Sequence, residues 1–171
     1  ISTSSIALQG AIIHDYLPFL SKVMMADGML DSPLRAVLRK GKSHYVCDAR
    51  LMKRLQTANL DRKNPLAKAA LLSMRDHLDL DMAPHLSGYD RERICVPPTC
   101  DCGKTECRYL CYLDVCASER YAIQVCNHNL LLADAIHQGS GKRPILPDSC
   151  AIVMDEAHKL PETARQMFGI T

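Results

Sequence analysis

The sequence predicts an α/β domain that is interrupted by a mainly α-helical, cysteine-rich insertion. Two apolar, strand-like segments lie in the last third of the chain, at 121–126 and 150–154. Apolar residues at helical spacing cover 8–25, as expected of a helix that packs on a sheet. Between these regions, six of the nine cysteines crowd into the stretch from Cys95 to Cys116.

The first 40 residues predict a strand, a helix and a second strand. Residues 1–7 are expected to form a strand that runs into a Ser/Thr-rich turn, and the helix over 8–25 follows. Gly28 and Pro33 end this helix, because neither residue type suits a helix interior. A short strand is expected at 34–38.

The centre of the chain predicts helices and loops. A loop over 41–47 is followed by Asp48, which suits the N-cap of a basic helix over 49–57. A long helix is expected from Pro65 to Leu80, irregular backbone over 82–107, and another helix over 108–119.

The last part returns to α/β structure. It predicts a strand at 121–126, a short helix at 127–132, a strand at 150–154 and a helix at 159–168. The chain therefore divides into three expected parts: 1–40 and 121–171 from one α/β scaffold, and 41–120 inserted between them.

Residues Ala151 to His158 read Ala-Ile-Val-Met-Asp-Glu-Ala-His, an apolar run that ends in two carboxylates and a histidine. This layout is typical of the Walker B strand of a nucleic-acid-dependent ATPase. The strand is expected to be short, buried and parallel, with Asp155 and Glu156 at its carboxyl end, where ligands bind in open α/β sheets. There Asp155 would hold Mg²⁺ through water and Glu156 would position the attacking water. A strand that simply ends in a charged turn is the alternative.

A Walker B site also needs a phosphate-binding loop of the form G-x-x-x-x-G-K-[ST]. The segment Gly139-Ser140-Gly141-Lys142 fails this pattern, because Ile136 replaces the first glycine and Arg143 replaces the Ser or Thr. It lies in a Gly/Pro/Ser-rich stretch that reads as a surface loop. On its own, this chain is therefore expected to lack ATP hydrolysis.

The composition and charge of the chain indicate which cellular compartment and which partners to expect. A net charge of +2 is too small to indicate nucleic acid by itself, but basic residues cluster at Arg35, Arg39, Lys40, Lys42, Arg50, Lys53 and Arg54. We expect no signal peptide and no membrane span, since the chain opens with polar residues and no apolar run approaches the length of about 18 residues that a span needs. Nine cysteines without a secretory signal favour a reducing compartment.

The cysteines divide into expected structural and metal-binding groups. Cys111 and Cys116 are expected to pack within a helix, and Cys126 and Cys150 to be buried in strands. The other five cysteines lie on or beside irregular backbone: Cys47, Cys95, Cys100, Cys102 and Cys107. They indicate a metal site, because thiolates select zinc or an iron–sulfur cluster. The spacing of the cysteines does not decide between zinc and an iron–sulfur cluster.

Five ordered motifs carry a resemblance that covers nearly the whole chain. They are Ser2-Thr3-Ser4-Ser5-Ile6-Ala7-Leu8-Gln9, Lys40-Gly41-Lys42-Ser43-His44-Tyr45-Val46-Cys47, Cys107-Arg108-Tyr109, the segment from Gln124 to Asp134, and Asp155-Glu156-Ala157-His158. With them the chain resembles the DinG/XPD family of iron–sulfur superfamily-two DNA helicases, in particular its bacterial DinG-like members. The resemblance implies a RecA-like motor-domain fragment, from motif Ia to the DEAH box, with an inserted iron–sulfur domain. It places the phosphate-binding loop before residue 1 and the second motor domain after residue 171.

The resemblance also implies roles for individual residues. Asp155 would bind Mg²⁺ with ATP in the full-length enzyme, Glu156 would activate water, and His158 would couple nucleotide state to DNA. The DNA contacts would come from Thr3, Ser4, Ser5, Arg50, Lys53, Arg54, Asn127 and His128. Two alternatives remain for these residues: Asn127 and His128 suit a cap and turn, and the basic helix suits a solvated face.

The implied cofactor is a 4Fe-4S cluster. Its ligands are four of the five residues Cys47, Cys95, Cys100, Cys102 and Cys107, and the third ligand is either Cys100 or Cys102, since the gap from Cys100 to Cys107 is one residue longer than the family pattern. The implied partners are ATP and single-stranded or forked DNA, with 5′ to 3′ unwinding in repair or replication and a cytoplasmic, nucleoid-associated location. The alternatives are a stand-alone zinc-binding nucleic-acid or interaction module and, less favoured, an iron–sulfur redox sensor.

Overall fold

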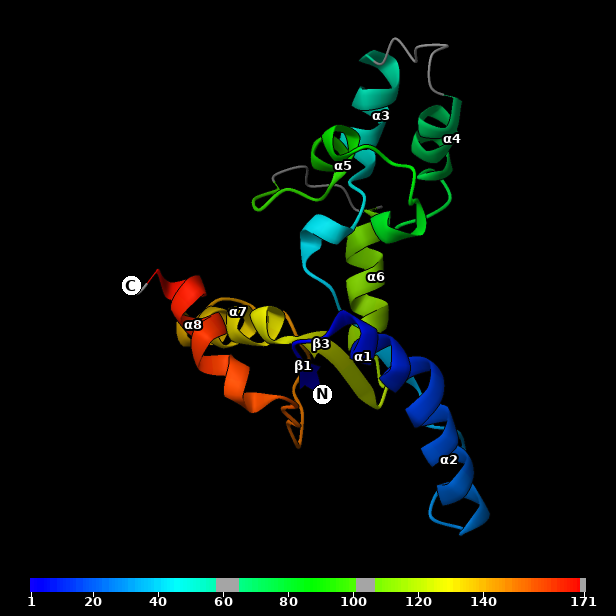
Figure 1. Ribbon diagram of the computed structural model, residues 1–171, viewed down its shortest axis with the longest axis vertical. Helices are drawn as coiled ribbons and strands as arrows, with labels where there is room; N and C mark the ends of the chain where they lie inside the picture. Colours follow the sequence, from blue (N-terminus) through cyan, green and yellow to red (C-terminus); the bar gives the residue numbers. More distant parts are fainter. Residues whose placement is uncertain (58–64, 101–106, 170–171) are drawn as a thin grey trace. The chain divides into compact units, whose positions relative to one another are not determined.

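A computed structural model describes residues 1–57, 65–100 and 107–169, in which the chain forms two compact units. The sheet unit comprises 1–40 and 116–171, and the helical unit comprises 41–115. Figure 1 traces the elements of both units along the sequence. None of the helices among the described residues combines the length and apolar character that a bilayer span requires.

The sheet unit is built on three parallel strands in the order β1-β3-β2. Its elements are β1 (Ser2–Thr3), α1 (Ile6–Ala11), a π-helical turn η1 (Ile12–Tyr16), α2 (Leu17–Ala26), β2 (Ala36–Leu38), β3 (Ile123–Asn127), α7 (His128–Gly139), η4 (Ala157–Lys159) and α8 (Leu160–Phe168). The helices α1 and α7 both pack against β1 and β3, and α8 lies beside α7 (Figure 1). The parallel sheet with its packed helices confirms the predicted α/β class.

The core of the sheet unit lies where the helix over 6–26 crosses the strands. Ile12, Leu17 and Val125 are buried there, and Ile1, Leu8, Ile13, Ala36, Leu38 and Ile123 pack around them. The predicted helical spacing therefore does face the sheet. The helix begins at Ile6, earlier than expected, because the Ser5 side chain caps it by accepting from the Leu8 amide at 3.2 Å.

The helical unit surrounds a separate apolar core. Its elements are η2 (Lys42–His44), α3 (Asp48–Thr57), α4 (Pro65–Ser73), η3 (Leu80–Met82), α5 (Gly88–Ile94) and α6 (Arg108–Ala117), of which α6 runs two residues beyond the unit. The buried core residues are Val46, Leu51, Ala70, Leu71, Met74, Leu80, Ala83, Leu86 and Ile94. A second cluster joins Tyr45, Cys47 and Val96 to Tyr109 and Tyr112.

Two predictions for this central region are wrong. The helix expected from Pro65 to Leu80 ends at Ser73, whose hydroxyl donates back to the Ala70 carbonyl at 2.8 Å, and turns follow. The stretch expected to be irregular contains α5, which Ser87 caps by accepting from the Asp90 amide at 3.0 Å. A Ser three residues before an Asp is a helix-start signal, and it was present in the sequence.

The buried strand predicted at 150–154 is also wrong in part. The segment does run parallel to β1, but through a single bridge between Ser2 and Met154. Ile152 and Val153 are 56% and 58% exposed, because the segment lies at the sheet edge beside β1. Its pairing direction is as predicted, whereas its burial is not.

Candidate functional site

Three chain segments of the sheet unit end at the same edge of the sheet. The strand β1 pairs in parallel with β3, with Thr3 opposite Asn127. On its other side, the Ser2 amide donates to the Val153 carbonyl at 2.8 Å, and the Asp155 amide donates to the Ser2 carbonyl at 2.8 Å. Because the segments are parallel, the residues that follow them meet at their carboxyl ends, where α/β proteins bind ligands.

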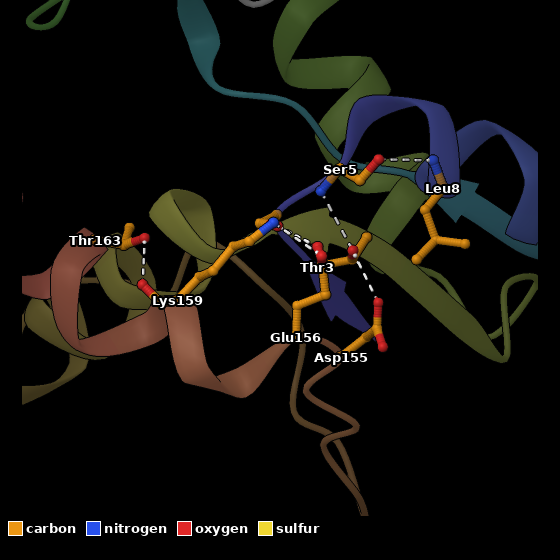
Figure 2. A network of polar contacts seen from close by, with 8 residues as sticks. Thr3, Ser5, Leu8, Asp155, Glu156, Lys159 and Thr163 are labelled. Atoms are coloured by element: carbon orange, nitrogen blue, oxygen red, sulfur yellow. Dashed lines mark hydrogen bonds and ion pairs between the residues drawn. The ribbon is translucent and has the colours of Figure 1, made fainter.

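Asp155, the first of the two predicted Walker B carboxylates, is hydrogen-bonded to Thr3, the first of the predicted DNA-contacting residues. Thr3 Oγ1 donates to Asp155 Oδ2 at 3.2 Å and accepts from the Ser5 amide at 3.3 Å (Figure 2). Thr3 has no exposed surface, and its predicted DNA contact stays a prediction. Ser4 and Ser5 are half-buried and remain candidates.

The second carboxylate, that of Glu156, lies in a tighter network. Ser4 Oγ donates to Glu156 Oε2, and Lys159 Nζ donates to Glu156 Oε1 at 2.8 Å and to Ser4 Oγ at 3.1 Å. The hydrogen bonds from Lys159 and then from Ser4 hold the pKa of the Glu156 carboxyl below its ordinary value. Glu156 is therefore an ionised acceptor at neutral pH.

Glu156 also has an unusual backbone. Its φ of 49° and ψ of 41° are left-handed, and it is the one non-glycine with positive φ among the described residues. Such a conformation is uncommon for a residue with a Cβ and persists where surrounding contacts maintain it. His158, two residues on, has an exposed side chain in the turn η4.

For Asn127 and His128 the sequence left two roles open, a helix cap with a turn or a contact with DNA. Asn127 is the N-cap of α7, since its Oδ1 accepts from the Leu130 amide at 2.8 Å, as the cap alternative predicted. His128 is 2% exposed, and its predicted role in contacting or positioning DNA stays a prediction. Its Nδ1 shares a hydrogen bond of 2.7 Å with Ser2 Oγ, whereas its buried Nε2 has no partner among the described residues.

The segment at 139–142 does not form a phosphate-binding loop. It lies at the carboxyl end of α7, where the amide of Lys142 donates to the His137 carbonyl at 2.9 Å. A phosphate-binding loop precedes the N-terminus of its helix, where amide groups point at the phosphates. The structure therefore confirms that this segment is not a phosphate-binding loop, and it shows that α7 extends to Gly139, beyond the predicted end at 132.

Cys47 and Cys95 lie on adjoining backbone in the helical unit. Val46 bridges Cys95 in antiparallel fashion, and the Cys47 amide donates to the Ile94 carbonyl at 2.7 Å. Cys47 is buried and Cys95 is half-buried. The two thiols thus belong to paired segments, although 48 positions separate them in the chain.

Cys107 is tied to the same region through its neighbour. Arg108 Nε donates to Asp48 Oδ1 at 2.8 Å, so an ion pair joins the residue after Cys107 to the residue after Cys47. The ring of Tyr109 also lies 5.4 Å from that of Tyr45. Three predicted cysteine ligands therefore belong to one neighbourhood of the fold.

Cys100 and Cys102 are the remaining predicted ligands. Cys100 is exposed, and Cys102 lies outside the described residues. Within 1–57, 65–100 and 107–169, no three Cys, His, Asp or Glu side chains converge as a metal-binding group. The 4Fe-4S ligand set stays a prediction.

The other cysteines only partly follow the sequence. Cys116 and Cys126 are buried as predicted, and burial raises the pKa of the Cys126 thiol. Cys111 and Cys150 are exposed, so the prediction that they are buried is wrong. Cys111 lies on the outer side of α6, and Cys150 precedes the exposed edge segment.

The basic helix α3 has one exposed cation among its three candidates. Arg50 donates to the carbonyls of Cys95 at 2.7 Å and Glu92 at 2.8 Å. Arg54 donates to Asp90 Oδ1 at 2.6 Å. These two arginines hold α3 against α5, whereas Lys53 is exposed. Lys53 is therefore the member of the group best placed for a phosphate.

Sequence reasoning missed Lys159 and Ser2. Lys159 lies three residues after Glu156, a spacing at which side chains on a helical turn meet, so this pair had a local signal. The contact between Ser2 and His128 joins positions 126 apart and had no local signal.

Comparison with known proteins found similarity to two helicases. The chain is 30% identical over 178 residues to a protein of Escherichia coli (strain K12) named ATP-dependent DNA helicase YoaA. It is 28% identical over 187 residues to the protein of the same name from Haemophilus influenzae. Each similarity covers 99% of this chain, which spans 27% of the length of each relative. The sequence matches no protein-family model.

Proposed function

We propose that this chain is part of an ATP-dependent DNA helicase of the DinG/XPD type. It would contribute the Walker B carboxylates and the motif Ia hydroxyls of a RecA-like motor domain. The observation that carries the proposal is the hydrogen bonding of Thr3 to Asp155 and of Ser4 to Glu156 at one sheet edge. The names of the two relatives support the same activity.

The two carboxylates suit different tasks. Both carboxylates are half-buried and follow parallel segments. Their oxygens suit Mg²⁺, because this ion prefers carboxylate and water ligands. Bound Mg²⁺ would neutralise charge on the phosphates of ATP. Thr3, which donates to Asp155, would orient it for that ion, and Glu156 would align the attacking water. His158, exposed two residues after Glu156, would transmit the nucleotide state to DNA.

The thiols of the cysteine neighbourhood are the ligand type that an iron–sulfur cluster requires. Cys47, Cys95 and Cys107 would hold it with either Cys100 or Cys102, and the cluster would cross-link the segments that carry these thiols. Arg50 and Arg108 brace the backbone beside these thiols. The helical unit would then act as a rigid element that separates DNA strands during 5′ to 3′ movement in repair or replication.

The proposed DNA contacts are independent of sequence. Ser4 and Ser5 offer small hydroxyls, and Lys53 offers an exposed ammonium, all of which suit phosphates rather than base edges. A translocating motor requires such contacts, because it must move along any sequence.

The test uses the full-length gene product purified without oxygen. We expect a brown protein that contains iron, hydrolyses ATP faster with single-stranded DNA, and separates a forked duplex. A colourless, zinc-containing protein that binds DNA without ATP hydrolysis would contradict the proposal and favour the zinc-binding module. Iron with no ATP hydrolysis would favour the redox sensor.

A further inference from the structure

Both carboxylate oxygens of Glu156 accept a hydrogen bond from another side chain of the protein. Oε1 accepts from Lys159, Oε2 accepts from Ser4, and Lys159 also donates to Ser4, which closes a triangle of hydrogen bonds. The backbone at Glu156 is also left-handed, a conformation that a glutamate seldom adopts. The side chain is therefore held in one place by its neighbours.

The Ser4 hydroxyl has a single proton to donate. In this structure that proton goes to Glu156. If the hydroxyl donates to a DNA phosphate instead, it cannot also donate to the carboxylate. Occupation of Ser4 by DNA and restraint of Glu156 by Ser4 are consequently mutually exclusive.

We propose that Ser4 and Lys159 are positioning residues that restrain Glu156 until DNA takes the Ser4 hydroxyl. The inference rests on the proposed function and adds to it a physical link between DNA binding and ATP hydrolysis. Without DNA, Glu156 is bonded to Ser4 and Lys159 and is not aligned on water. With DNA, the bond from Ser4 is lost, and Glu156 turns toward the water that attacks ATP.

The test compares ATP turnover of the full-length protein with and without saturating single-stranded DNA. For Ser4→Ala we expect DNA-free kcat to rise by about fivefold or more, the lower range of a site-to-site coupling, while kcat at saturating DNA stays near wild type. Lys159→Met should act in the same direction. Ser4→Thr keeps the hydroxyl and should restore the wild-type ratio of the two rates.

Thr163→Ala is the matched control. It removes a hydroxyl that donates to the Lys159 carbonyl at 3.1 Å and does not touch Glu156, so both rates should stay at wild-type values. A DNA-stimulated wild type whose ratio is unchanged in both Ser4→Ala and Lys159→Met would overturn the restraint alone. A wild type without ATP hydrolysis would overturn the proposed function, and the restraint with it.

Discussion

In the sheet unit the candidate side chains are hydrogen-bonded to one another, whereas in the helical unit the thiol of Cys95 contacts Arg50 and the Glu92 carbonyl rather than another candidate cysteine. Thr3 and Ser4 bond directly to Asp155 and Glu156. By contrast, Asp48 and Arg108 bring their segments together, and the thiols of Cys47 and Cys107 form no described metal-binding group.

The difference follows from the chemistry of the two sites. Parallel strands place polar side chains at one edge through backbone pairing, and hydroxyls and carboxylates can then satisfy each other without a ligand. Thiols are weak donors and acceptors, so they do not bond into a network by themselves. A cysteine site is therefore organised by its metal, and binding of the metal contributes to folding.

The sharpest test of this contrast removes a predicted cluster ligand. Cys47→Ser in the full-length protein should abolish nearly all iron and cluster absorbance, because Cys47 is buried within the cysteine neighbourhood. Cys111→Ser, at an exposed position on α6, should keep both. Iron content and the visible spectrum measure the outcome. Full cluster occupancy in Cys47→Ser would show that the site lies elsewhere.

A smaller effect is expected at the ion pair beside the cysteines. Arg108→Ala removes hydrogen bonds to Asp48 and to the carbonyls of Arg75 and Met74, at 2.8 and 3.0 Å. Because the pair is one-third exposed, we expect a loss of about 1–2 kcal/mol in local stability. Hydrogen exchange at the Cys47 and Val96 amides should then accelerate by about tenfold.

Arg165→Ala is the control for that change. Its pair with Glu162 spans 3.6 Å and is about two-thirds exposed, so exchange in α8 should barely change. Equal effects of the two substitutions would mean that the ion pair of Arg108 does not hold the cysteine segments.

The smallest expected effect concerns DNA. Lys53→Ala should lower the slope of log affinity against log salt by about 0.7 for single-stranded DNA, the contribution of one phosphate contact. Lys68→Ala, an exposed lysine on α4, should leave the slope unchanged. Titrations at several salt concentrations with two unrelated sequences measure it. An unchanged slope in Lys53→Ala would show that the exposed face of α3 is only solvated.

Local signals in the sequence were reliable where neighbouring residues decide the structure. The start of α6 at Arg108 and the parallel direction of the segment before Asp155 were both predicted. Burial of 150–154 was not, because an apolar run does not reveal whether its strand lies inside a sheet or at its edge.

The contacts within the site were less predictable. The motif residues Ser4 and Glu156 were identified separately, but their hydrogen bond depends on the pairing of segments that lie 152 positions apart. Likewise, nothing near Arg50 or Arg54 in the sequence indicates that they bond to α5 rather than to DNA. Contacts between residues far apart in the chain decide both the Ser4–Glu156 hydrogen bond and the bonds of the two arginines.

The most direct measurement is ATP turnover by Glu156→Gln in the full-length protein. Glutamine keeps the shape of the side chain but not the carboxylate that aligns water, so we expect kcat to fall by about 10²-fold or more while nucleotide and DNA affinities stay near wild type. Glu162→Gln makes the same exchange at an exposed position on α8 and should keep wild-type turnover. Near-normal kcat in Glu156→Gln would contradict the assignment of Asp155 and Glu156 as Walker B carboxylates.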